Sequence, residues 1–385
     1  MAGNFWHKNY MAKTVACNLQ LEVIPTDRAV LDRLPILGMI GVDYFGVACR
    51  AVIPARFTVA VTPLEPAGAE TRHAFGPARL LKAKLPLPKG TRTFRYSVTV
   101  AAGGASKSYG PYEARVPKGG VGFRFMTAGG MAIYREHPTA LVSFLAKVRQ
   151  IHPDLFIHTG NYQNCNAWDF MWTADFLKLA QPTFAGIPMF ATVNVTEMMS
   201  PASFEHTFFF PPDDADWARW TVAIGNVRFV AVEAFGQSFD ETDAGVKWLE
   251  GVLNSAKEDY VLVLNSHVTG CSPTSFDRWY AEGTKHTAAK INPLLIKYHV
   301  TATIGNIHRC YERIDPPPGQ GVPTIITGKA GGLGWPLRTR PVKYSKVITD
   351  QDHYVLFEVK SDSLEMKAVA VDGKLIDTCT FKPRK

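Results

Sequence analysis

The chain has 385 residues, of which 46% are hydrophobic and 20% are charged, and its formal net charge at pH 7 is +8. This length suits two or three domains, and the composition is typical of a soluble globular protein. The absence of any run of about 18 apolar residues argues against a membrane-spanning helix. The N-terminal segment lacks the apolar stretch and cleavage site of a secretory signal.

Residues 13–118 predict an all-β region. The segments FTVAVTPLE (57–65) and FRYSVTV (94–100) alternate apolar and polar side chains, as strands with one buried face do. No helical period is present there. We therefore expect a small β-sandwich, followed by a linker at VPKGG (116–120).

From residue 121 onwards, predicted strands alternate with predicted helices. Helical spacing of apolar residues marks PTALVSFLAKVRQIH (138–152), AWDFMWTADFLKLA (167–180), DAGVKWLEGVLNSA (243–256) and INPLLIKYH (291–299). Strands are predicted at GFRFMTA, PDLFIHTG, GIPMFATVNV, YVLVLNSH, VTATIGN and VPTIITG, a hairpin at WTVAIGNVRFVAVEA, and further β-structure at HYVLFEV, LEMKAVAVDG and LIDTCTF. This alternation indicates a layered α/β architecture behind the sandwich.

Five loops follow predicted strands of the α/β region, where chemistry concentrates in such folds. They are TAGGMA (127–132), GNYQNCN (160–166), VNVTE (193–197), SHVTGC (266–271) and GNIHRC (305–310). In order and spacing they resemble the loops of calcineurin-like metallophosphoesterases, most closely the purple acid phosphatase branch. The resemblance extends to the front sandwich and to flanking segments such as FEHTFFFP and HYVLFEV.

The resemblance implies an α/β protein with two domains. Residues 1–118 would form a fibronectin III-like β-sandwich, and residues 119–385 a metallophosphoesterase-like α/β/β/α sandwich. Enzymes of this family hydrolyse phosphoric esters at two metal ions that share a bridging aspartate and activate a hydroxide.

Matched loop by loop, most ligand positions of the family carry other residues here. The positions that correspond to the dinuclear site are Gly130, Asn161, Asn164, Asn194, Val195, His267, Asn306 and His308. Asn161 replaces the bridging carboxylate, Asn164 replaces the tyrosinate, and Val195 replaces the histidine that assists the leaving group. Ala132 occupies one further ligand position.

No carboxylate therefore stands at a ligand position, although hard divalent ions prefer anionic oxygen. We expect no metal cofactor, or at most one divalent ion held by His267, His308 and Asn194. Cys165, Cys271 and Cys310 lie close to these loops in sequence and could instead make a soft-metal site with the two histidines, or could be small buried residues.

The sequence thus predicts a catalytically degenerate metallophosphoesterase-fold protein that acts as a structural or interaction subunit of a larger assembly. A divergent phosphoesterase with a reduced, mononuclear site is the first alternative. A metal-free binder of phosphate or nucleotide is the second, with Arg309, Arg313 and Lys329 near the glycine-rich GKAGGLG segment.

Partners and compartment follow from charge and cysteine usage. The basic clusters at 82–92 and 338–343 predict either a solvated surface or an anionic partner such as RNA, besides other protein subunits. Seven aromatic residues lie in or near the five loops and their flanking segments, and two interpretations stay open: some are exposed and form an apolar docking face, or most are core. They are Trp168, Trp172, Phe204, Phe208, Phe209, Phe210 and Trp335. The six cysteines form no CxxC spacing, which favours an intracellular, reducing compartment, either cytosol or organelle matrix.

Overall fold

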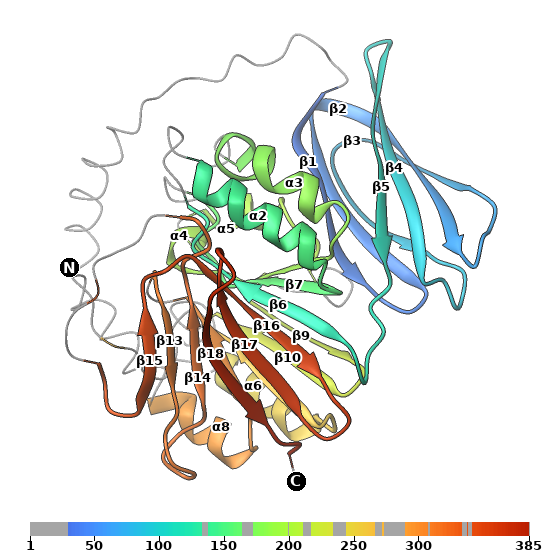
Figure 1. Ribbon diagram of the computed structural model, residues 1–385. Coiled ribbons are helices and arrows are strands. Elements are labelled where there is room, and N and C mark those ends of the chain that lie inside the picture. The colour runs from blue at the N-terminus through green and yellow to red at the C-terminus, as the bar shows by residue number, and fades with distance from the viewer. Residues whose placement is uncertain are drawn as a thin grey trace.

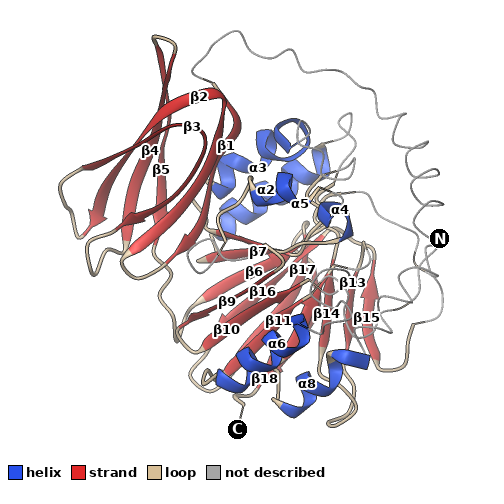
Figure 2. Ribbon diagram, turned by 180° about the vertical axis from the view of Figure 1, so that it is seen from behind, coloured by secondary structure: helices blue, strands red, loops and turns tan. Residues whose placement is uncertain are grey.

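The structure is a computed structural model that describes residues 30–132, 138–163, 172–198, 200–210, 217–233, 244–265, 272, 289–306, 309–332, 337 and 341–384. Its strands form three sheets, and helices lie on the outer faces of two of them (Figures 1 and 2). Within the described part of the chain, no helix is both long and apolar enough to cross a lipid bilayer.

The first sheet is the predicted N-terminal β-sandwich. Its strands are β1 (Leu31–Ile40), β2 (Tyr44–Glu65), β3 (Thr71–Pro86), β4 (Thr93–Ala102) and β5 (Ala105–Arg115). The 22-residue strand β2 pairs with β1 along its first half and with β4 along its second half, while β3 pairs with both halves. The sheet bends near Ala55, where the β2–β3 register shifts, and so closes over one core of alternating apolar side chains. The likeness to fibronectin type III domains stays a prediction.

Two further sheets pack face to face behind the sandwich. The six-stranded sheet has the order β18-β17-β16-β6-β7-β8, and the seven-stranded sheet has the order β15-β13-β14-β12-β11-β10-β9. The strands of the six-stranded sheet are β6 (Arg124–Ala128), β7 (Leu155–His158), β8 (Met189–Ala191), β16 (His353–Val359), β17 (Leu364–Ala370) and β18 (Leu375–Phe381). Those of the seven-stranded sheet are β9 (Arg219–Ile224), β10 (Val227–Val232), β11 (Tyr260–Leu264), β12 (Ala302–Gly305), β13 (Tyr311–Ile314), β14 (Thr324–Thr327) and β15 (Ser345–Thr349).

Helices cover the outer faces of both sheets, which gives the predicted α/β/β/α layering (Figure 1). On the six-stranded side they are α2 (Thr139–Ile151), the π-helical η2 (Trp172–Leu177), α3 (Lys178–Phe184), α4 (Val195–Met198) and α5 (Pro201–Glu205). On the seven-stranded side they are α6 (Ala244–Ser255) and α8 (Asn292–Lys297). Between the sheets, the Phe125 ring stacks on Phe357 at 4.7 Å and meets the Phe229 ring edge-on at 5.0 Å.

The predicted elements are confirmed with one correction within the described residues. The strand predicted over 186–195 ends at Ala191, and helix α4 begins at Val195. The carbonyl oxygen of Asn194 accepts hydrogen bonds from the backbone N–H groups of Glu197 and Met198, so the chain turns directly after Asn194. An apolar run alone does not distinguish a strand that continues from one that ends in a short turn of helix.

The sandwich packs against the six-stranded side through a buried seam. Phe209 lies on two glycines of the sandwich, because a Cβ at Gly38 or at Gly46 would come within 2.6 Å of Phe209 atoms. The buried Arg33 guanidinium donates hydrogen bonds to the hydroxyls of Ser203 and Thr207, at 3.4 and 3.3 Å.

The aromatic rings predicted as an exposed docking face are core instead. Trp172, Phe204, Phe208 and Phe210 have no exposed surface, and Phe209 is 3% exposed. They fill the seam between the sandwich and the α/β layers, together with Tyr162 and Phe176. Trp168 and Trp335 lie outside the described residues. The prediction of an exposed apolar face is therefore wrong for the five described rings, and the alternative that they are core is confirmed.

Candidate functional site

The candidate site lies where the central strands of the two sheets end. The loops after β6, β7, β8 and β12 carry Gly130, Asn161, Asn194 and Asn306, in that order. Strands β6, β7 and β8 are parallel neighbours, so their loops emerge at one edge of the sheet. The other predicted positions, Asn164, His267 and His308, lie outside the described residues, as do Cys165 and Cys271.

A chain of side-chain amides ties three of these loops together. Nδ2 of Asn194 donates to the carbonyl oxygen of Asn306 at 2.5 Å, and Nδ2 of Asn306 donates to the carbonyl oxygen of Gly160 at 2.7 Å. Asn194 is 1% exposed and Asn306 is fully buried. The second, third and fifth loops are thus linked by neutral hydrogen bonds among buried groups, as buried polar groups require.

Asn161, which the sequence comparison predicts at the position of the bridging carboxylate, is not part of the hydrogen bonds that link Asn194, Asn306 and Gly160. It has a left-handed backbone with φ of 59°, which asparagine tolerates better than most residues. Its Oδ1 accepts a hydrogen bond from the Thr196 hydroxyl. The one side-chain oxygen that could take over from a bridging carboxylate is therefore already engaged within the protein.

The first loop leaves no room for a ligand side chain. Gly130 has φ of 70°, and a Cβ there would lie 1.9 Å from the carbonyl oxygen of Gly328. A Cβ at Gly129 would lie 2.5 Å from Nδ2 of Asn306. Backbone hydrogen bonds from Gly130 N–H to Gly160 and from Ala330 N–H to Gly129 hold this close approach. An aspartate could enter this loop only if the backbone moved.

One carboxylate at this edge is Glu197, which the sequence reasoning did not single out. It is fully buried, and its oxygens accept hydrogen bonds from the backbone N–H groups of Asn161, Tyr162 and Asn194, at 3.2, 3.2 and 2.9 Å. Burial raises the pKa of Glu197 to about 7, although these N–H groups act in the opposite direction. The sequence feature that could have indicated Glu197 is its place in the VNVTE loop, three residues after Asn194.

The aromatic pair His158 and Tyr162 holds the backbone of the second loop in place. His158, the last residue of β7, stacks on Tyr162 with ring centroids 3.6 Å apart, and its Nδ1 accepts the N–H of Gly160 at 3.1 Å. Burial lowers the pKa of His158 well below its ordinary value, so the ring stays neutral. The Tyr162 hydroxyl donates to the carbonyl oxygen of Thr192 at 2.9 Å. These contacts position the backbone of the loop and present no group to a substrate.

The basic residues proposed for metal-free phosphate binding have other contacts. The Arg313 guanidinium binds Asp377, with Nε 2.6 Å from Oδ2, and also lies 3.3 Å from Asp315. Nζ of Lys329 donates to the carbonyl oxygen of Asp350. Arg313 is therefore a structural residue that joins β13 to β18, while Arg309 is half-buried. Cys310, one of the three proposed thiol ligands, is buried at 2% exposure.

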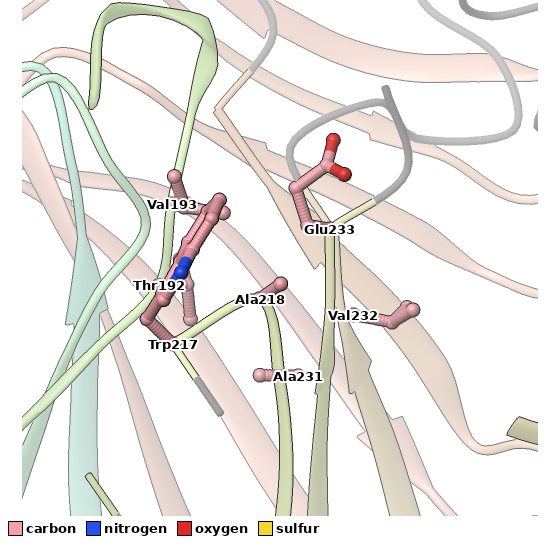
Figure 3. Close-up of a pocket in the computed structure, with 7 residues that line it drawn as sticks. All are labelled: Thr192, Val193, Trp217, Ala218, Ala231, Val232 and Glu233. Carbon is pink, nitrogen blue, oxygen red and sulfur yellow. The ribbon is translucent and has the colours of Figure 1, made fainter. Parts of the chain in front are cut away.

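A shallow dent lies beside the third loop (Figure 3). Its lining residues are Thr192, Val193, Trp217, Ala218, Ala231, Val232 and Glu233. The lining is mainly apolar and carries one carboxylate and no cationic side chain. This composition does not suit a phosphate group.

The described residues do not fit the dinuclear metal centre of the fold family. Among them, no group of three or more His, Cys, Asp and Glu side chains lies close enough together to hold a metal ion. The amide nitrogens of Asn194 and Asn306 point to backbone carbonyls, and Oδ1 of Asn161 accepts from Thr196. Two divalent ions bring four positive charges, which this neutral donor set cannot offset.

Known structures share this fold. A purple acid phosphatase from yellow lupin seeds superposes with a TM-score of 0.77 at 16% identity, over 90% of this chain and 74% of that one. PhoD superposes with a TM-score of 0.65 at 10% identity, over 93% and 90%. GAP50, the anchor in the inner membrane complex of Plasmodium, superposes with a TM-score of 0.55 at 13% identity, over 69% and 90%.

These likenesses establish the architecture. The chain has the fold of a calcineurin-like metallophosphoesterase of the purple acid phosphatase type, with an N-terminal β-sandwich. A scan against protein-family models finds no match, and a sequence search of curated proteins finds none either. At these identities the fold is shared, while activity depends on the residues at the site.

Proposed function

We propose that this protein is a non-catalytic member of the phosphoesterase fold that serves as a structural or interaction subunit of a larger assembly. The observation that carries the proposal is the amide chain Asn194–Asn306–Gly160 at the edge where the family binds metal. Each link is a hydrogen bond between buried neutral groups, so these amide nitrogens have partners within the protein and offer no ligand to an ion.

Two further features support the proposal. The close backbone approach at Gly129 and Gly130 excludes an aspartate from the first loop in this conformation. Among proteins of this fold, GAP50 is described as an anchor in a membrane complex, so a structural role on this scaffold has a precedent.

One observation favours the mononuclear phosphoesterase as the second candidate. Oδ1 of Asn306 is buried and accepts no hydrogen bond from the described residues. An orphaned buried acceptor is a group that a cation could satisfy. In that case His267, His308 and Asn194 would complete the ligand set, and the ion would polarise a phosphate ester.

The first test is metal content and hydrolysis by the purified full-length protein. We expect well under one transition-metal ion per chain by elemental analysis, and no hydrolysis of p-nitrophenyl phosphate or its diester above background with added Mn²⁺, Fe²⁺ or Zn²⁺. About two ions per chain would contradict the proposal. One ion per chain that is lost in His267→Ala, together with metal-dependent hydrolysis lost in the same variant, would establish the second candidate.

A second test asks whether the amides are structural. Asn194→Ala removes the donor to Asn306 and leaves that buried carbonyl unsatisfied, so the free energy of unfolding should fall by about 1–3 kcal/mol. The matched control is Asn254→Ala on the exposed end of α6, which should change it by less than about 0.5 kcal/mol. A stability gain in Asn194→Ala would mark the residue as a strained ligand rather than a structural tie.

A further inference from the structure

Charge is distributed unequally between the two parts of the molecule. Residues 30–118 carry 13 Lys and Arg residues against five Asp and Glu, a net charge of +8. Residues 119–385 carry 26 Lys and Arg residues against 27 Asp and Glu residues, a net charge of −1. The excess positive charge of the whole chain therefore belongs to the N-terminal β-sandwich, and the phosphoesterase-like part is close to neutral.

Most acidic groups of the sandwich are neutralised within it. Asp32 lies 2.7 Å from Arg50, Glu70 lies 2.7 Å from Arg72, Glu113 lies 2.5 Å from Arg95 and Glu65 lies 3.4 Å from Arg92. These internal pairs leave a second set of cations available to a ligand. Five exposed residues have no carboxylate partner among the described residues: Arg56, Lys89, Lys107, Arg115 and Lys118. We call these five residues the basic strip.

The basic strip follows strands β4 and β5, which lie side by side (Figure 1). At the C-terminal end of β4, Arg56 pairs with the exposed Ala101 and lies on the outer face of the sheet. Lys107 pairs with the buried Val100 at the same end, so it starts from the opposite face, and its Nζ lies 5.5 Å from the centre of the Tyr109 ring. Arg115 pairs with Thr93 at the other end of β4, and Lys89 lies in the turn that leads into β4. At about 3.3 Å per residue, the ten residues of β4 separate the two groups by about 30 Å.

Hydroxyl groups line the outer face of β4 and β5 between Arg56 and Arg115. Thr99 on β4 and Ser108 on β5 are paired across the strands, with 2.7 Å between their hydroxyl oxygens. Ser106 pairs with Ala101 and is exposed. Ser and Thr hydroxyls are regular donors to phosphate oxygens, beside Lys and Arg.

From this arrangement we infer that the sandwich binds single-stranded nucleic acid, such as RNA, through the phosphate backbone and without reading bases. A linear polyanion can contact both ends of the strip at once. Insertion into a bilayer requires apolar side chains, and the exposed large hydrophobic residues of the described chain, Val42, Val121, Val142 and Leu375, all lie outside β2–β5. This inference does not depend on whether the phosphoesterase-like edge is catalytic.

The test uses the full-length protein and a fluorescein-labelled 20-nucleotide oligo(U) RNA, with fluorescence anisotropy at 50–300 mM salt. Five phosphate contacts predict a slope of log K against log salt of about −3.5. The variant with Arg56, Lys89, Lys107 and Lys118 all changed to Gln should bind about tenfold or more weakly at 50 mM salt, with a slope of about −1.

The matched control removes the same charge from the other part of the molecule, with Lys247, Lys257, Lys367 and Lys374 changed to Gln, all of them exposed. It should keep at least about half of the wild-type affinity. Equal loss in both variants, no RNA binding at 50 mM salt, or tighter binding to polyglutamate or to phosphatidylserine vesicles would overturn the inference.

A footprint on the unaltered protein provides a measurement that does not depend on variants. Oligo(U) should protect Lys89, Lys107 and Lys118 from acetylation at least threefold in mass spectrometry, and should leave Lys247 and Lys374 unprotected. Uniform protection, or none, would contradict a site on the basic strip.

Discussion

The carboxylate of Glu197 lies buried between the second and third loops and accepts three backbone N–H groups. Its hydrogen bonds fix the placement of the two loops relative to each other. A single side chain, three positions after Asn194, orders both backbones. Because no cation lies opposite it among the described residues, its charge is disfavoured and its pKa is raised by burial.

This raised pKa predicts a pH-dependent stability. The unfolded chain ionises Glu197 near its ordinary pKa of 4.5, and the folded chain near 7, so folding retains the proton between these values. The stabilisation is therefore fully present below pH 4.5 and is lost as the pH rises through 7, by about 3 kcal/mol. Urea unfolding at pH 5, 6, 7 and 8 gives the free energy of unfolding of the wild type and of Glu197→Gln. The difference between the two proteins at each pH measures the contribution of Glu197.

Glu197→Gln should be the less stable protein at pH 5, because its amide group places a donor against backbone donors. The difference should shrink between pH 5 and about pH 7 and then level off towards pH 8. The same substitution at the exposed Glu205 on α5 is the control and should give a difference that does not vary with pH. A constant difference for Glu197→Gln would mean that Glu197 is ionised throughout.

At the scale of elements, a polar cluster joins β18, an edge strand of the six-stranded sheet, to β13 of the seven-stranded sheet. Tyr311 and Arg313 on β13 both bind Asp377 on β18, with the Tyr311 hydroxyl 2.6 Å from Oδ2. The Arg313 and Asp377 side chains are 12% and 7% exposed. Pairs shielded from water to this degree depend on both members, because removing one charge leaves the other poorly solvated.

Asp377→Asn should therefore lower the free energy of unfolding by about 2 kcal/mol, a value reduced from that of fully buried pairs for partial exposure. Chemical denaturation followed by tryptophan fluorescence measures it. The same substitution at Asp362, whose pair with Lys382 is more than 70% exposed on both sides, should have no measurable effect. Equal effects at the two positions would show that the β13–β18 contact is not specific.

For the whole molecule, the seam between the sandwich and the α/β layers contains buried aromatic rings and buried hydrogen bonds. Phe209 lies against Gly38 and Gly46, the Tyr96 hydroxyl donates to the carbonyl oxygen of Ala185 at 2.8 Å, and Arg33 reaches α5. A seam with buried aromatic rings and buried hydrogen bonds couples the two parts energetically. Thermal unfolding should accordingly be a single calorimetric transition.

Gly38→Ala tests this coupling. A Cβ at Gly38 would lie 2.6 Å from the carbonyl oxygen of Phe209, so the backbone of the seam must move. We expect a loss of about 1–3 kcal/mol and a split into two transitions in calorimetry. Gly251→Ala adds the same methyl group in open space on α6 and should be neutral or stabilising. Two transitions in the wild type would show that the seam contributes little. An unchanged, single transition in Gly38→Ala would contradict the close approach of Phe209 to Gly38.

Local patterns in the sequence determined much of the architecture. The period-two alternation in β2 and β4 and the helical spacing in α2, α6 and α8 each come from one face being buried, and burial at that scale is visible in the chain itself. The order of the five loops indicated the fold. The absence of carboxylates at Gly130 and Asn161, and of a histidine at Asn306, predicted an altered site. The net charge and its position along residues 30–118 are also properties of the sequence.

Contacts between distant segments decided the rest. Whether Phe209 is exposed depends on Gly38 and Gly46 of the sandwich, which lie more than 150 residues away in sequence and pack against Phe209. From the sequence alone, Asn306 could be a ligand or a structural residue. The structure shows that its amide nitrogen donates a hydrogen bond to the carbonyl oxygen of Gly160. Side-chain hydrogen bonds and burial depend on distances of a few ångströms between such segments, and a one-dimensional pattern does not contain those distances.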